Sequence, residues 1–470
     1  IENLRAPLAA DEFRMSFLAG KLAPFENLAR VFITENQLKE AFLCVEKSRA
    51  RSLADALDEN LTLAGKTKSA SNLIRKLEGL REELNWFYSR LSRAEEAEIE
   101  RLQREAKRGE KQIADVMRQI ESTSDAKFSA KESLDFERLQ MELGAKKALI
   151  EFINFDGNLS AFIVGNEKIR FVENLARESE ILSLLEGLRF QFGALRYGAE
   201  NLENFMPELK RRADFYLQKL YEKLFKPLES LLENRDLIIV PSGALNYVPF
   251  SALFDGASYL IETREIVHAP SATVWQKLSA KSSKRLENAL LLGFADEQIP
   301  LVEKEIKTLE KILPQTKSLI GAAATFAAYT KNAPHFDIIH LACHGQFRPE
   351  NPLFSSLHLA DGFVTVRDVC AQKLKAELVI LSACETGLNE IFAGEEILGL
   401  ARGFLSAGAS SLVLSLWTVS DAATVRLMKD FYENLQRGAS VAASLKAAQN
   451  NFIKQGVHPY FWSLFAVIGK

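Results

Sequence analysis

Two short apolar runs of this sequence lead into residues that together can do nucleophilic chemistry. The run DIIHLAC leads into His344 and Gly345, and the run ELVILSA leads into Cys384, which the polar segment ETGLNEIFAGEE follows. A cysteine thiolate attacks a carbonyl carbon, while a neighbouring imidazole favours the thiolate and protonates the leaving amine. Gly345 has no Cβ, so its backbone N–H and that of Cys384 are expected to form an oxyanion hole. The pattern indicates a Cys–His pair for acyl transfer.

The other cysteines and histidines point to packing. With no CxxC spacing in so long a chain, we expect free thiols and neither a disulfide framework nor a structural zinc site. Alternation along a strand turns Cys343 away from His344, which argues against a metal site that joins these two residues to Cys384. His340 is interpreted as a packed histidine, and His458, in HPYFW, as part of a packed turn.

Acidic residues near the same pair are candidates for the substrate pocket. Asp421 follows the apolar run SLVLSLW, where a carboxylate would receive a basic side chain of the substrate. Ser420 and Asp421 equally suit the N-cap of the helical stretch AATVRLMKDFYENL, and both interpretations stay open. Glu385, Glu395 and Glu396 are further pocket candidates.

The elements that must position these residues alternate between strands and helices. Apolar runs at 236–240, 289–292, 338–341, 378–381 and 411–416 are short and almost wholly apolar, and helical stretches such as EKEIKTLEKIL separate them. They predict a mostly parallel sheet covered on both faces. Before them, 148–155 and 159–164 flank Asp156-Gly157, which predicts a β hairpin with a tight turn. In a parallel sheet, ligands bind beyond the carboxyl ends of the strands, where His344 and Cys384 are expected.

The amino-terminal third has helical periodicity throughout. The segment AFLCVEKSRARSLADAL resembles the last unit of a tetratricopeptide (TPR) array. Leucines from Leu73 to Leu91 then recur at spacings of four and three amid dense charge, which is typical of a coiled coil. Leu134 to Leu143 resumes the helical spacing, so we predict a long hairpin that ends at Gly144.

Composition excludes several classes of protein. The 470 residues carry a formal net charge of -3, so no basic excess indicates a nucleic-acid partner or an anionic membrane. No apolar run is long enough to span a bilayer, and no secretory leader is recognised, which favours the cytoplasm.

Four segments of the sequence resemble one known family. They are IIHLACHGQF, LVILSACETG, GLARGFLSAGASSLVLSLWTVSDAAT and HPYFWSLFAVIG, and they are similar to those of CHAT-domain cysteine peptidases, relatives of caspases and separase. The resemblance implies an α/β caspase-like fold, with a mostly parallel sheet sandwiched by helices, after an all-α TPR-like and helical-hairpin region. It assigns His344 as the general acid/base and Cys384 as the nucleophile. The expected domains are TPR-like helices over 1–60, a charged helical hairpin or coiled coil over 61–145, a degenerate peptidase-like half over 146–285 and a catalytic half over 286–470.

The function expected from this resemblance is that of a cysteine endopeptidase without a cofactor. Its TPR-like helices would receive an activator protein or dock a protein substrate. The resemblance also implies bacterial signalling or antiviral defence, with a partner such as a pore-forming gasdermin as the target. One alternative is a non-catalytic scaffold that keeps only the fold, and another is a thioesterase or acyltransferase that uses the same Cys and His.

Overall fold

The computed structural model describes most of the chain after residue 133 and part of the region before it. The described ranges are 23–49, 134–196, 202, 204–282, 285–295, 299–346, 355–382, 394–417 and 421–470. Between 76 and 119 only scattered residues are described, and their backbone is helical. The chain divides into two compact units, one made of Ile1–Leu28 with Arg51–Ser133, the other of Ala29–Ala50 with Leu134–Lys470.

A single large sheet organises the second unit. Its strands lie in the order β3-β2-β1-β4-β5-β14-β13-β12-β8-β6-β7. Their bounds are β1 Lys147–Phe155, β2 Asn158–Val164, β3 Ile169–Arg177, β4 Asp236–Val240, β5 Ile266–His268, β6 Ala289–Gly293, β7 Thr316–Ile320, β8 Ile338–Ala342, β12 Leu378–Leu381, β13 Ser411–Ser415 and β14 Phe465–Gly469. Within it only β1/β2, β2/β3 and β13/β14 pair antiparallel. The predicted mostly parallel sheet is confirmed.

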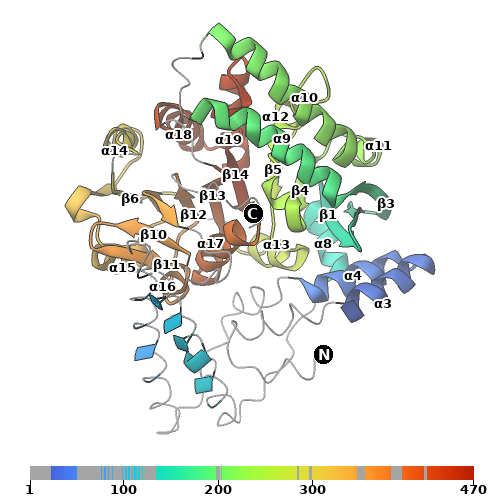
Figure 1. The fold of residues 1–470 in the computed structure, drawn as a ribbon, viewed down its shortest axis with the longest axis horizontal. Coiled ribbons are helices and arrows are strands. Elements are labelled where there is room, and N and C mark those ends of the chain that lie inside the picture. Colours follow the sequence, from blue (N-terminus) through green and yellow to red (C-terminus); the bar gives the residue numbers. More distant parts are fainter. Residues whose placement is uncertain are drawn as a thin grey trace. The chain divides into compact units, whose positions relative to one another are not determined.

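Helices cover both faces of this sheet (Figure 1). One face carries α9 Glu178–Arg196, α10 Met206–Leu224, α14 Val302–Glu310, α18 Asp421–Gln436 and α19 Val441–Ile453. The other face carries α8 Phe136–Leu143, α13 Ala272–Ser279, α15 Phe326–Asn332, α16 Val366–Cys370 and α17 Gly394–Ala407. The short helices α11 Glu229–Leu232 and α12 Leu260–Thr263 also belong to the second unit. So does α4 Leu38–Ser48, while the boundary between the two units falls within α3 Ala23–Thr34.

The local sequence explains several of these elements. All five residues of β8 are buried, because the strand lies between β6 and β12 and both of its faces are covered. Asp156 and Gly157 adopt φ angles of 52° and 81°, which is the positive-φ turn that lets β1 return directly as β2. The predicted hairpin and its turn are confirmed.

Among the strands from β1 to β7 in the order of the sheet, the strand direction changes once, between β14 and β13. Strand β14 pairs antiparallel with β13 and parallel with β5, where Ile468 lies opposite His268. The strands β13, β12, β8, β6 and β7 therefore run one way, and β14, β5, β4 and β1 run the other way. The carboxyl ends of β8, β12 and β13 meet at one edge of the sheet.

Helix α4 is fastened to the sheet unit by buried polar side chains. Glu46 is 4% exposed and accepts hydrogen bonds from the backbone N–H groups of Ala272 (2.9 Å) and Thr273 (2.8 Å), at the first turn of α13. Arg49 Nε lies 3.1 Å from Oε1 of Glu151, a fully buried residue of β1. The carboxylate of Glu46 stabilises the positive end of the α13 dipole, so α4 is an integral part of this unit.

Candidate active site

The strands β8 and β12 bring two loops to the same edge of the sheet. They are adjacent and parallel, and their register sets Leu341 opposite Leu381. Beyond that pair, the backbone N–H of Ser382 donates to the Leu341 carbonyl at 3.0 Å. His344 comes three residues after Leu341, and Cys384 comes three residues after Leu381. His344 and Cys384 thus each follow, by three positions, one member of the paired residues Leu341 and Leu381.

His344 is held by its own backbone. It is half-buried and lies between β8 and β9, a two-residue strand formed by Gly345–Gln346. Its carbonyl accepts a hydrogen bond from His358 N at 2.8 Å. His358 lies on β10 (Ser356–Leu359), which joins β9 and β11 (Gly362–Thr365) in a small second sheet. Sequence analysis missed this sheet, because its strands are short and carry no continuous apolar run.

The same small sheet sets the direction of the Gly345 backbone. His344 and His358 form a hydrogen-bonded antiparallel pair, and the next pair in this register is Gly345 with Leu357. Hydrogen-bonded and non-hydrogen-bonded pairs alternate in an antiparallel ladder, so the N–H of Gly345 points away from β10. That N–H is therefore not used by the ladder, as an oxyanion donor requires.

Several predicted site residues lie outside what the structure describes. Cys384 and Glu385 fall in 383–393, which is outside the described residues. Asp421 is the first residue of α18, and Glu395 and Glu396 lie in the first turn of α17, but only their backbone is described. Whether Asp421 binds a basic side chain or caps α18 thus stays a prediction.

The residues interpreted as packing residues are buried. Cys343 is 1% exposed, and His340 is fully buried in β8. His458 accepts a hydrogen bond from the N–H of Tyr460 at 3.1 Å, and its ring packs edge-on against Phe192. Burial lowers the pKa of His458 to about 4, with a smaller contribution from Lys210 and against a backbone hydrogen bond with Leu209. This histidine is neutral and structural, as expected.

Trp417 is a residue near this edge that the sequence did not single out. It follows β13 by two positions and precedes Asp421 by four. Its indole N–H donates to the Tyr460 carbonyl at 3.1 Å, and its ring packs on Phe192 with centroids 5.2 Å apart. The aromatic run HPYFW, which contains Tyr460, was the only hint in the sequence that an aromatic contact lies here. Trp417 thus anchors the chain directly after β13, near the carboxyl end of that strand.

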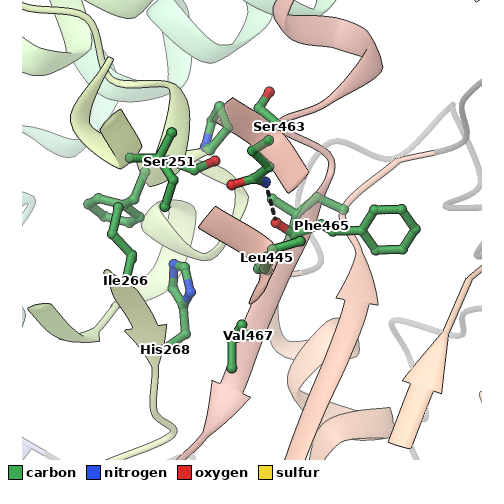
Figure 2. Close-up of a pocket in the computed structure, with 13 residues that line it drawn as sticks. Ser251, Ile266, His268, Leu445, Ser463, Phe465 and Val467 are labelled. Carbon is green, nitrogen blue, oxygen red and sulfur yellow. Dashed lines mark hydrogen bonds between the residues drawn. The ribbon is translucent and has the colours of Figure 1, made fainter. Parts of the chain in front are cut away.

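A separate pocket lies beside the paired strands β5 and β14 (Figure 2). The volume open to the centre of a water molecule is about 10 Å³, which is room for roughly one water and too little for a small-molecule ligand. The ring of His268 points into it, and burial lowers the pKa of this residue to about 4 against a backbone hydrogen bond with Val467. None of the residues that line the pocket comes from β8 or β12. It is thus distinct from the candidate active site.

Two features are absent from the described part of the chain. Among the residues that the structure describes, no group of three His, Cys, Asp or Glu side chains is placed to hold a metal ion. Over the same residues, no helix combines the length and the apolar character needed to cross a bilayer.

Comparison with known proteins gives one family and one fold. The chain is 24% identical to "Tetratricopeptide repeat protein 28" of Mus musculus and to the protein of the same name of Homo sapiens, over 54% of its own length and 13% of theirs. A crystal structure of the Saccharomyces cerevisiae separase–securin complex matches 96% of this chain and 37% of that chain, with a TM-score of 0.54 and 11% identity. This likeness confirms the predicted separase-like caspase fold. The chain spans a small part of each of these relatives.

The family assignment rests on the carboxyl-terminal part of the sequence. The model of the CHAT domain matches residues 215–470, which is more than half of the chain. The match contains the strands β8 and β12 and the loops that carry His344 and Cys384. The predicted resemblance is confirmed, and the chain belongs to the CHAT-domain family.

Proposed function

We propose that this protein is a cysteine endopeptidase in which His344 and Cys384 form the catalytic dyad. The observation that carries the proposal is the register of β8 and β12, which gives the two residues equal offsets from the pair Leu341 and Leu381. Carboxyl ends of adjacent parallel strands are a frequent place for catalytic groups. Membership of the CHAT family and the separase-like fold support the same chemistry.

The proposed reaction follows from the residue types. The imidazole of His344 takes the proton of the Cys384 thiol, and the thiolate attacks the scissile carbonyl carbon. The N–H groups of Gly345 and Cys384 would bind the resulting oxyanion, each donor contributing about 3 kcal/mol. The imidazolium then gives its proton to the leaving amine, and an acyl-enzyme thioester remains. Water, deprotonated by His344, hydrolyses the thioester and restores the thiol.

The substrate is proposed to be a protein or peptide. An acidic pocket that includes Asp421 and Glu385 would favour a basic residue before the scissile bond. The similar separase structure is a complex with a second protein, and the curated relatives are tetratricopeptide repeat proteins by name, which supports protein partners here. We propose an activator bound at the TPR-like helices, a co-encoded target such as a gasdermin, and a cytoplasmic role in bacterial signalling or defence.

Cleavage of a peptide library, read by mass spectrometry, tests this function. The wild-type chain is compared with Cys384→Ala and His344→Ala, with and without candidate activators. Cys370→Ala and His335→Ala are the matched controls, because they remove an exposed cysteine and an exposed histidine. We expect cleavage by the wild type and both controls, and none by the two dyad variants. A wild type that cleaves nothing under any condition would favour the non-catalytic scaffold.

A further inference from the structure

A buried polar group lies in the middle of the strand that leads to His344. His340 is fully buried in β8, with Leu291 of β6 and Ile380 of β12 beside it in the sheet. Its neighbours along the strand are apolar, and a polar side chain in such surroundings is costly unless all its polar atoms are bonded. The surroundings of His340 therefore need an explanation.

Two helices on one face of the sheet satisfy both ring nitrogens. Nε2 of His340 lies 3.0 Å from Oε1 of Glu305 on α14, and Nδ1 lies 3.1 Å from the hydroxyl oxygen of Tyr432 on α18. Glu305 is 4% exposed and Tyr432 is fully buried. One proton arrangement satisfies all three groups, with Nε2–H donating to the carboxylate and the phenol donating to Nδ1. Burial, and then the Glu305 charge, raise the pKa of Tyr432 well above its usual value, so the phenol keeps its proton.

Stability alone does not account for this network. Apolar residues of similar volume often replace a buried ionic or polar cluster with no loss of stability. A buried cluster in which every polar atom is hydrogen-bonded differs from an apolar one. Its hydrogen bonds form in only one relative position of the strand and helices that they join. Here these elements are the strand β8 and the helices α14 and α18.

The parts that the network joins all lead to the candidate active site. His340 precedes His344 by four residues, and its sheet neighbour Ile380 precedes Cys384 by four. Tyr432 lies on the helix that begins at Asp421, the pocket candidate. The three hydrogen-bonded side chains thus fix β8, which leads to His344, relative to α18, which begins at the substrate-pocket candidate Asp421.

We propose that His340 is a positioning residue, which acts with Glu305 and Tyr432 to fix β8 and so to aim His344 at its reaction partner. This role rests on the proposed peptidase function. The role goes beyond the dyad itself. It means that catalysis needs the polar network, although an apolar core at the same place would fold as well.

The test separates stability from catalysis. The triple variant His340→Leu, Glu305→Leu, Tyr432→Phe replaces the whole network and leaves no buried charge without a partner. We expect a melting temperature close to that of the wild type and a kcat lower by about 10- to 100-fold with KM unchanged, because a displacement of about 1 Å costs that much in rate. A triple variant with wild-type kcat would overturn the proposal.

A single change and a matched control guard against misfolding of the triple variant. Tyr432→Phe removes only the hydroxyl that donates to Nδ1, and we expect it to lower kcat by a smaller factor. Tyr259→Phe removes another buried tyrosine hydroxyl, which donates to Asp214 on α10 at 2.6 Å, while its ring packs against Phe254 and Trp462. It should leave kcat unchanged. Equal kcat values for these two variants would contradict the positioning role.

A second measurement does not depend on activity. The imidazole NMR signals of His344, assigned with His344→Gln, should shift in the Tyr432→Phe and triple variants and stay in place in Tyr259→Phe. An unmoved His344 signal would overturn the positioning role even if the chain proved inert. Inertness of the wild type with a shifted signal would instead contradict the proposed peptidase function alone.

Discussion

Replacing Glu46 by Ala should release helix α4 from the first turn of α13. The Glu46 carboxylate accepts hydrogen bonds from Ala272 N at 2.9 Å, Thr273 N at 2.8 Å and the Thr273 hydroxyl at 2.6 Å. The threonine hydroxyl can rotate to another acceptor, but the two backbone N–H groups cannot. In the variant both lie at a buried helix end with no carboxylate to receive them.

The size of the effect follows from those two groups. A buried donor left without an acceptor costs about 1 to 3 kcal/mol, so the pair costs roughly 2 to 6 kcal/mol. One change opposes this loss. The charge of Glu46 is the second cause, after burial, of the raised pKa of Glu151. Removing that charge ends its repulsion of the Glu151 carboxylate and keeps the attraction between Glu151 and Arg49, which offsets part of the loss. We therefore expect a destabilisation of about 2 to 4 kcal/mol, in the lower half of the range.

Amide hydrogen exchange measures this effect where it arises. A loss of 2 to 4 kcal/mol in local stability speeds exchange at Ala272 and Thr273 by roughly 30- to 1,000-fold. Glu40→Ala is the matched control, because it removes the same side chain from an exposed position of the same helix. Its exchange rates at α13 should equal those of the wild type. Unchanged rates at Ala272 and Thr273 in Glu46→Ala would refute the fastening of α4 to α13.

Three other predictions follow from single residues. Burial raises the pKa of Glu151 well above 4.5. The contribution of the protonated Glu151 side chain to stability is therefore complete below about pH 4.5, and it is lost as the pH rises through the folded-state pKa. Glu151→Gln should therefore melt higher than the wild type above that pH, and parallel curves of melting temperature against pH would contradict this. Gly408→Ala places a Cβ 2.4 Å from the Leu374 carbonyl oxygen at a φ of 120°, so it should lower stability by about 3 kcal/mol or more in denaturant titrations. Asp421→Asn should weaken any preference for Arg or Lys before the scissile bond about tenfold in substrate profiling, and an unchanged profile would assign Asp421 to capping α18.

The strands near the site could be predicted because they are buried on both faces. Such strands read as continuous apolar runs, and 338–341 and 378–381 match β8 and β12 within one residue. The edge strands β3 and β7 were missed, since Ile169–Arg177 and Thr316–Ile320 mix exposed and half-buried positions and resemble loops. Burial on both sides is thus what made a strand recognisable.

The polar networks could not be predicted, because they depend on contacts between distant segments. Glu305 stands among charges in EKEIKTLEKIL and looks like a solvated helix residue, yet it is 4% exposed and bonded to His340. Glu46 and Thr273 are likewise 227 positions apart. No local pattern marks which charge of an amphipathic helix turns inward. Only the packing of the helix against the sheet decides it.

The most direct test of the His344–Cys384 pairing is the pH dependence of Cys384 alkylation. Iodoacetamide reacts with the thiolate, and mass spectrometry separates Cys384 from Cys44, Cys343 and Cys370. If His344 activates Cys384, the reaction in the wild type begins at a lower pH than in His344→Ala, while His335→Ala matches the wild type. Superimposable curves for the wild type and His344→Ala would contradict the catalytic dyad.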